Sequence, residues 1–209
     1  MSRAQFDQAA CDQLSQCIQE IEAETDAELV LVVRARSGSY RHADYLFGAL
    51  LAFAGLLFLL FSPFEFAHYW VAFDIALLFA LGAFLSSRSS HLRRLLTTKK
   101  YRADAVRTHA AAMFYEAGIA NTNSEMGVLI YLSLLERRLE LFADRGVLSA
   151  TPPLEWNDHL FALHQAGREP QLQTLLARLR ELGALLKEHL PPTGENPNEL
   201  PDMPRFDLK

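Results

Sequence analysis

Two long apolar blocks stand out from the pattern of hydrophobic and polar positions along this chain. Tyr45 to Phe61 contains no charged residue, and Tyr69 to Leu85 contains one, Asp74. Within residues 43–87, each block reaches the roughly 17 to 25 residues that cross a ~30 Å hydrocarbon core as a helix. Because only Ser62 to His68 links them, the blocks are predicted to form an antiparallel transmembrane hairpin.

Basic residues flank the hairpin and are absent from it. They precede the first block or follow the second: Arg34, Arg36, Arg41, Arg88, Arg93, Arg94, Lys99 and Lys100. Because positive residues are enriched on the cytoplasmic side of a membrane, both flanks and both termini are predicted to face the cytoplasm. The acidic start of the chain lacks the pattern of a signal peptide. The alternative, a helical pair buried in a soluble protein, is disfavoured because the charges lie outside the blocks.

Asp74 is the one ionisable residue within the second apolar block, and such residues are costly in a membrane. Small residues on the two helices are expected to form their contact seam: Ala72, Ala76, Ala80 and Ala83 against Gly48, Ala52 and Gly55. Asp74 would then point away from the seam. Either hydration near the interface or a bond near His68 accounts for it, or it contacts a second protein or another copy of the chain.

Outside the hairpin, apolar residues recur at helical spacing in some segments and form short continuous runs in others. Helices are predicted over Arg3–Glu24, Ser90–Gly118, Leu154–Ala166 and Pro170–His189, strands over Ala27–Val33, Gly127–Leu134 and Arg138–Asp144, and an extended tail over Pro191–Lys209. Strands that are apolar on both faces need helices on both sides. The predicted fold class is α/β, a small sheet sandwiched by helices and interrupted by a transmembrane hairpin.

The domain organisation follows from these elements. Residues 1–42 supply the first helix and strand, 43–87 the hairpin, 88–190 the rest of the sheet domain and 191–209 the tail. A net charge of -5 and a pI of 5.8 give no basic field, so composition does not support nucleic-acid binding. Cys11 and Cys17 belong to no metal-binding or redox motif and are interpreted as ordinary buried thiols in a reducing compartment.

Three segments resemble, in the same order, the TPM-domain family. They are Glu24–Val30 (ETDAELV), Gly127–Ser133 (GVLIYLS) followed by Glu136-Arg137-Arg138, and Ala143–Val147 (ADRGV). The late helices with Trp156 and the Asn198–Pro201 motif (NELP) are similar to bacterial members that carry a membrane hairpin inside the domain. The resemblance therefore implies an α/β sandwich and the inner membrane of a bacterium.

The same resemblance implies candidate chemistry. Plant relatives have been linked to acid-phosphatase activity, and some members have acidic metal contacts. Where the family commonly has a Gly-Tyr-Gly type of turn, this chain has Ala143-Asp144-Arg145-Gly146. The acidic candidates here are Glu24, Asp26 and Glu28 at the start of the first strand and Asp144 at the end of the third. Their oxygens would suit Ca²⁺ or Mg²⁺, whereas the alternative is that they are caps and solvated charges.

Charged residues also occupy the tight turn between the second and third strands. Glu136, Arg137 and Arg138 are expected at an exposed hairpin tip, where a partner could contact them. The preferred function is a membrane-anchored cytoplasmic module that binds, or helps to assemble or maintain, other membrane proteins. Its expected partners are the lipid bilayer and either another membrane protein or a second copy. The alternative is a metal-dependent phosphatase.

Overall fold

The chain folds into two compact units. The computed structural model describes residues 8–64, 68–122, 124–168, 171–194, 199–200 and 205–207. Residues 1–37 and 103–209 belong to the sheet unit, and residues 38–102 form the hairpin unit. The hairpin unit therefore interrupts the sequence of the sheet unit, as predicted, although it extends beyond residues 43–87 at both ends.

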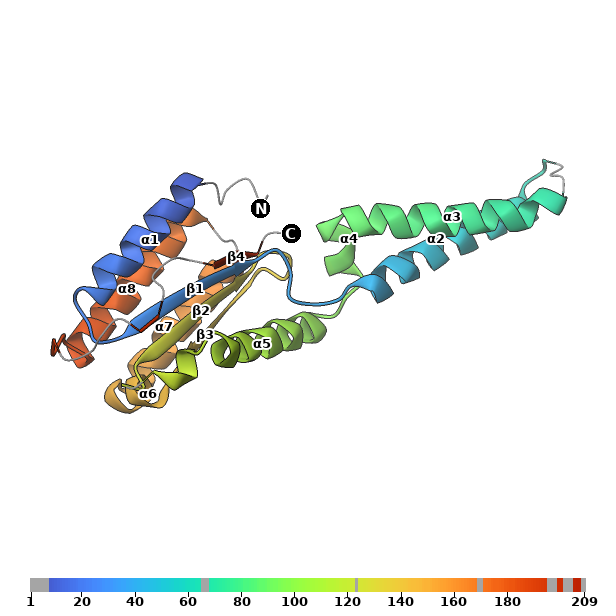
Figure 1. The fold of residues 1–209 in the computed structure, drawn as a ribbon. Coiled ribbons are helices and arrows are strands. Elements are labelled where there is room, and N and C mark those ends of the chain that lie inside the picture. The colour runs from blue at the N-terminus through green and yellow to red at the C-terminus, as the bar shows by residue number, and fades with distance from the viewer. Residues whose placement is uncertain are drawn as a thin grey trace. The chain divides into compact units, whose positions relative to one another are not determined.

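A four-stranded sheet with helices on both faces makes up the sheet unit (Figure 1). Its described elements are α1 (Gln8–Glu22), β1 (Glu28–Arg34), most of α5 (Lys99–Glu116), η2 (Ile119–Asn121), β2 (Gly127–Ser133), β3 (Arg138–Ala143), α6 (Arg145–Ala150), α7 (Pro153–Arg168), α8 (Leu172–His189) and β4 (Arg205–Asp207). In the order β3-β2-β1-β4, strand β1 runs parallel to β2 and β4, and β3 is antiparallel to β2. The α/β fold class is confirmed.

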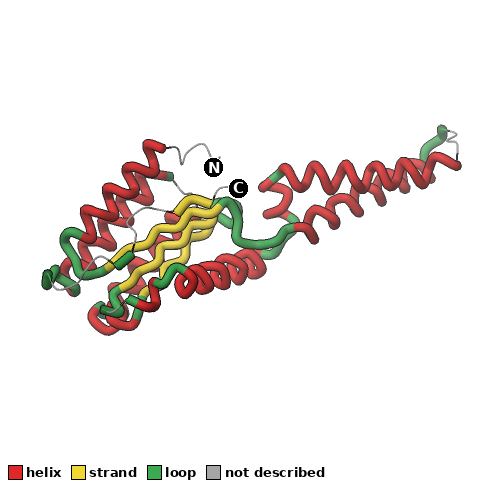
Figure 2. Tube along the Cα trace, in the orientation of Figure 1, coloured by secondary structure: helices red, strands yellow, loops and turns green. Residues whose placement is uncertain are grey.

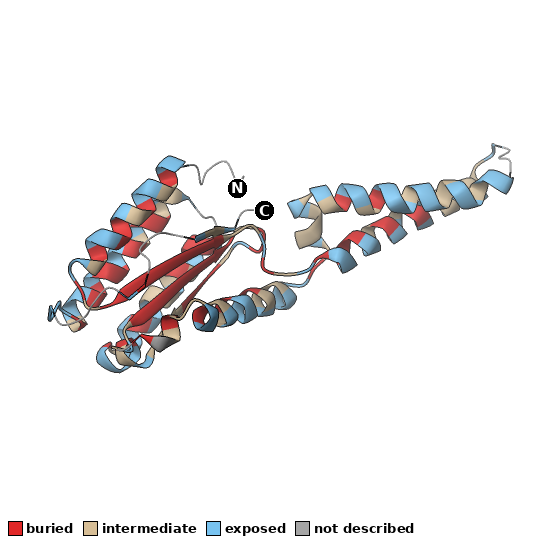
Figure 3. Ribbon diagram, in the orientation of Figure 1, coloured by how far each residue is buried: buried red, intermediate tan, exposed pale blue. Residues whose placement is uncertain are grey.

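The central strands are buried on both faces because their side chains alternate between two apolar cores. Leu29, Leu31 and Val33 of β1 pack on the side of α1, α7 and α8. Val30 and Val32 of the same strand pack on the other side, against α5. Figure 3 shows the resulting burial of the central strands.

The predicted helix Ser90–Gly118 is two helices, α4 (Ser90–Leu95) and α5. The side chain of Thr98 accepts a hydrogen bond from the Tyr101 amide, which caps the start of α5. Arg102 donates to the carbonyl oxygens of Arg94 at 2.5 Å and Thr97 at 2.7 Å. These bonds satisfy groups that a helix end would otherwise leave open, so the chain turns here.

The tail does not stay outside the sheet, contrary to the prediction. Its residues Arg205–Asp207 form β4, and Asp207 forms an ion pair with Arg34 of β1 at 2.7 Å. Helix α6 was not predicted, and it begins after Asp144, whose side chain accepts a bond from the Arg145 amide. The predicted starts Arg3 and Pro170, and Asn198 and Pro201 of the 198–201 motif, lie outside the described residues.

The hairpin unit consists of α2 (Arg41–Phe61), α3 (His68–Arg88), α4 and the first turn of α5. Helices α2 and α3 pack side by side along their length (Figure 2). Pro63, which cannot continue a helix, follows the end of α2. The two apolar blocks thus form the helical hairpin that their short link predicted.

Candidate functional site: the apolar hairpin and its polar base

Both helices of the hairpin are long and apolar enough to cross a membrane. The candidate spans are Arg41–Phe61 and Tyr69–Arg88, and only 17% and 11% of an apolar stretch of 18 residues within each are buried. The core helix of a soluble protein would be mostly buried, whereas Phe53, Phe58 and Leu60 are more than half exposed. Apolar surface on this scale marks a site of contact with lipid or protein.

The two helices approach most closely at glycines. A Cβ added to Gly48 would lie 2.6 Å from the carbonyl oxygen of Phe79, and one added to Gly82 would lie 2.9 Å from the Cα of Gly48. On α2, Gly48 and Ala52 are buried and Gly55 faces Leu78, as the predicted seam requires. Small residues thus allow backbone contact on the α2 side.

On α3 the predicted seam was wrong except at Ala83, whose backbone nitrogen would lie 3.2 Å from a Cβ added to Gly48. Ala72, Ala76 and Ala80 are exposed, and the row that meets α2 instead contains Leu78, Gly82 and Ser86. Asp74 lies one helical turn before Leu78 in this same row and is half-buried, so it does not point away from the seam. The reason is that Gly82 and Ser86 provide a closer approach and a polar bond, which alanines cannot.

A buried ion pair closes the base of the hairpin, where α2 begins and α3 ends. Asp44 accepts hydrogen bonds from Arg93 Nε at 3.0 Å and Nη2 at 2.6 Å, and from Ser86 Oγ at 2.9 Å. The side chains of Arg93 and Asp44 are 12% and 9% exposed. Three polar side chains therefore join α2, α3 and α4.

The geometry of this ion pair favours strong binding between the helices. Two parallel bonds from one guanidinium to one carboxylate are stronger and more specific than a single neutral hydrogen bond. Asp44 lies in the first turn of α2, where the helix dipole also favours a negative charge. A pair this buried is costly to break, because either partner alone would be a buried charge. The sequence alone did not predict that Asp44 and Arg93 form a site.

Aromatic rings gather at the same end of the hairpin unit. The Tyr101 hydroxyl donates to the carbonyl oxygen of Ser39 at 2.8 Å, and its ring centre lies 5.9 Å from that of Tyr40 and 4.9 Å from that of His42. These contacts bring the start of α5 to the start of α2. Arg41 donates to the hydroxyl of Tyr45 at 3.1 Å, which adds a cation and a ring at this level.

The comparisons with known proteins concern the fold. No family model and no curated protein matches this chain. The fold is similar to that of BA42. The NMR structure of BA42, from the psychrophilic bacterium Bizionia argentinensis, has a TM-score of 0.56 at 14% identity, over 96% of this chain and 94% of BA42. At that identity the likeness shows the fold alone, and the TPM resemblance stays a prediction.

The predicted metal ligands have separate protein contacts. Glu24 pairs with Lys187 at 3.1 Å, and Asp26 accepts bonds from the amide and hydroxyl of Thr193. Glu28 is buried and accepts a bond from the Glu199 amide at 3.2 Å, whereas Asp144 caps α6. Within the described ranges, no group of three His, Cys, Asp or Glu side chains is arranged to hold a metal ion.

The turn between β2 and β3 differs from the predicted exposed tip. Arg137 is exposed and has a positive φ of 51°, but Glu136 is buried, at 7% exposure. Glu136 accepts bonds from the Ser37 amide and the Ser133 hydroxyl, so it was wrong to expect it on the surface. Through its bond with Ser37, the Glu136 carboxylate fixes the chain just before the hairpin unit begins at residue 38.

Two buried groups of the sheet unit have shifted pKa values. Burial raises the pKa of Tyr131, although its bonds with Ser37 and Arg34 oppose the shift. Burial also acts to raise the pKa of Glu140, but bonds from His164 and Arg138 outweigh it, and the pKa of Glu140 is lowered. Arg138, a predicted partner contact, therefore binds Glu140 within its own chain.

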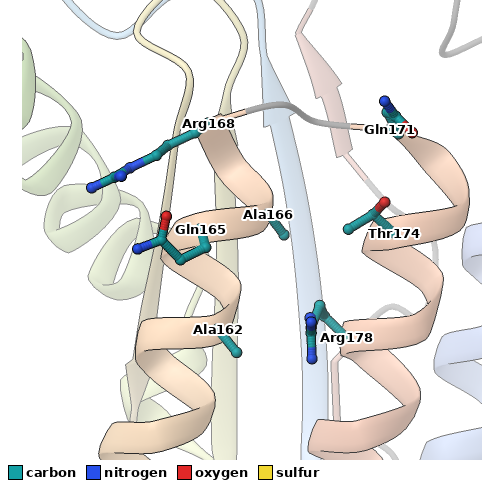
Figure 4. A pocket seen from close by; sticks show the side chains of 7 residues that line it. All are labelled: Ala162, Gln165, Ala166, Arg168, Gln171, Thr174 and Arg178. Carbon is teal, nitrogen blue, oxygen red and sulfur yellow. The ribbon is translucent and has the colours of Figure 1, made fainter.

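A shallow groove of about 360 Å³ lies between α7 and α8 (Figure 4). Figure 4 shows Ala162 and Ala166 on one wall and Thr174 and Arg178 on the other. Arg178 pairs with Glu181 at 2.5 Å. The described lining residues include no carboxylate, imidazole or thiol, so they offer hydrogen-bond donors but no acid and base pair for catalysis.

Proposed function

We propose that this chain is a membrane-anchored module whose hairpin crosses a bilayer. The observation that carries the proposal is that α2 and α3 pack on each other yet leave most of their apolar surface exposed. Each helix has 21 residues, which span about 30 Å at a rise of ~1.5 Å per residue. That length matches the hydrocarbon core of a bilayer.

The sheet unit faces the cytoplasm in this proposal. Arg41 and Arg88, the first residue of α2 and the last of α3, both lie at the base of the hairpin. The link between the helices contains no basic residue. This charge asymmetry supports an orientation with both flanks inside. The TPM resemblance further supports the inner membrane of a bacterium.

Within the membrane, we propose that the hairpin binds another membrane protein or a second copy of this chain. Ala72, Ala76 and Ala80 form an exposed stripe of small residues on α3, opposite the row that meets α2. Small side chains let a further helix approach closely, which is how helices associate when lipid surrounds them. The proposed contact of Asp74 with a partner belongs to the same hypothesis.

A photoreactive amino acid at Ala76 is expected to crosslink to protein in intact membranes. The matched control is the same photoreactive residue at Phe53 of α2, which is also exposed but lies among bulky apolar side chains. We expect protein adducts from Ala76 and mainly lipid adducts from Phe53, as resolved by electrophoresis and mass spectrometry. Lipid adducts alone from both positions would contradict binding at the alanine stripe.

One observation favours the second candidate, a metal-dependent phosphatase. In the described part of the chain, Oδ2 of Asp144 is buried and has no hydrogen-bond partner. Buried carboxylate oxygens of this kind are suitable ligands for Ca²⁺ or Mg²⁺. Asp144 and Glu28 both lie beside Gly127, because the Asp144 amide bonds to the carbonyl oxygen of Gly127 and Glu28 pairs with Gly127 in the sheet.

Calcium separates the two candidates through the melting temperature of the full chain in detergent. If Asp144 binds the ion, Ca²⁺ raises the melting temperature and Asp144→Asn removes the rise. Asparagine is an adequate helix cap, so this variant keeps α6, whereas Asp144→Ala costs about 1 kcal/mol. Asp158→Asn, at an exposed carboxylate of α7 outside the candidate ligands, is the control. The binding function expects no effect of Ca²⁺, and a rise that depends on Asp144 would favour the phosphatase.

A further inference from the structure

The segment that follows α3 is strongly basic. Residues 88–102 contain no carboxylate, and their cations are Arg88, Arg93, Arg94, Lys99, Lys100 and Arg102. Two of these have internal roles, since Arg93 binds Asp44 and Arg102 caps the end of α4. Arg88, Lys99 and Lys100 are exposed. Their charge is therefore presented to whatever surrounds the base of the hairpin.

The contacts of the hairpin unit hold these three cations at one level. Arg88 is the last residue of α3, and the bond from Ser86 to Asp44 sets that end of α3 beside the first turn of α2. The contacts of Tyr101 with Ser39 and Tyr40 bring the start of α5, with Lys99 and Lys100, to the same end. The cations of a continuous segment are thus gathered beside the apolar helices.

The depth of this level matches that of lipid headgroups. Trp70 and Arg88 lie near opposite ends of α3, about 27 Å apart at a rise of ~1.5 Å per residue, which is close to the thickness of a hydrocarbon core. The guanidinium of Arg88 lies 5.2 Å from the centre of the Phe84 ring, a cation–π contact that places this charge beside the apolar end of α3.

We propose that Arg88, Lys99 and Lys100 form a binding surface for the phosphate groups of anionic phospholipids. Basic residues directly beside a membrane helix attract anionic headgroups on the cytoplasmic leaflet. This inference rests on the proposed membrane insertion, and it specifies the class of lipid that the hairpin unit binds. The alternative source of phosphate, a soluble anion, lacks the acyl chains that the exposed face of the hairpin would contact.

Lipid titration of the full chain in a neutral detergent, followed by native mass spectrometry, tests this surface. The probes are phosphatidylglycerol, phosphatidylcholine and soluble glycerol phosphate. We expect the wild type to bind phosphatidylglycerol about a hundredfold more tightly than phosphatidylcholine. The variant Arg88→Gln/Lys99→Gln/Lys100→Gln is expected to bind phosphatidylglycerol about a hundredfold more weakly than the wild type.

Two matched variants define the controls. Arg145→Gln/Arg168→Gln/Arg180→Gln removes the same charge from exposed positions of the sheet unit and is expected to keep the preference. Arg88→Lys/Lys99→Arg/Lys100→Arg keeps the cations and is also expected to keep it. Equal binding of both lipids by the wild type, an unchanged preference in the glutamine variant at residues 88, 99 and 100, or equally tight binding of glycerol phosphate would overturn the proposal.

Insertion is measured separately, so that the two proposals can fail independently. The wild type and the glutamine variant are reconstituted with phosphatidylcholine alone and washed with alkaline carbonate before flotation. We expect both to stay with the vesicles, because the apolar helices and not the three cations carry insertion. Loss of the wild type from these vesicles would contradict the membrane anchor itself, whereas retention with no lipid preference would contradict only the headgroup surface.

Discussion

Replacing Arg93 by alanine is expected to open the base of the hairpin unit. The substitution removes both Arg93 bonds and the counter-charge of the buried Asp44 carboxylate, and it keeps the bond from the Ser86 hydroxyl. Removing one partner of a buried ion pair costs about 3 to 5 kcal/mol. At about 1.4 kcal/mol per tenfold, amide exchange in α4 and the first turn of α2 should rise by roughly a hundredfold or more. Hydrogen exchange of the full chain in detergent measures it.

A double variant separates the buried charge from the loss of packing. Asp44→Leu with Arg93→Met removes both charges and keeps apolar volume, so it is expected to recover most of the protection. Arg88→Ala is the control, because it removes an exposed cation from the same end of the hairpin. Exchange in Arg93→Ala within about twofold of the wild type would contradict the role of this ion pair.

The strands of the sheet could be predicted from the sequence because their apolar residues are continuous. Residues 29–33 and 128–132 supply both cores of the sheet, and strands that are apolar on both faces are covered by helices on both sides. Strand β4 could not be predicted, because its segment Arg205–Asp207 contains a single apolar residue, Phe206. Its place depends on backbone pairing with β1 and on the ion pair with Arg34, which only the folded chain brings together.

The ion pair between Asp44 and Arg93 at the base of the hairpin could not be predicted from the sequence for a similar reason. Asp44 stands directly before the uncharged run of the first block, where it reads as part of a polar flank. Its partner Arg93 lies 49 residues away, among other basic residues that the orientation rule already explains. One signal was present, since a lone acid at the edge of a membrane helix favours a nearby cation as partner.

The contact seam between α2 and α3 was predicted correctly on α2, but on α3 only Ala83 was placed correctly. Gly48 and Ala52 lie at the contact on α2, but residue size did not identify the matching face of α3. Alanines recur on one side of α3, whereas the contact uses Gly82 with Ser86 on another. The bond from Ser86 to Asp44 fixes the rotation of α3, so that Gly82 and Ser86 are the small residues that meet α2.

A reporter protein that is active on only one side of the membrane, fused at Lys209 or placed in the link between α2 and α3, is expected to reveal the orientation of the hairpin. Because the link between α2 and α3 has no basic residue and the base has many, the link should cross to the far side of the membrane while both flanks stay in the cytoplasm. A green fluorescent protein and an alkaline phosphatase, which are active on opposite sides of the inner membrane, report the side directly. Each is placed separately at Lys209 and in the link after Pro63 of the full chain.

The pattern of these two reporters at the two positions is the most direct test of a membrane-anchored module with a cytoplasmic sheet unit. The account predicts fluorescence without phosphatase activity at Lys209 and phosphatase activity without fluorescence after Pro63. Fluorescence at both positions would show that the hairpin does not cross the bilayer. The reversed pattern would place the sheet unit outside the cytoplasm, and either result would contradict the account.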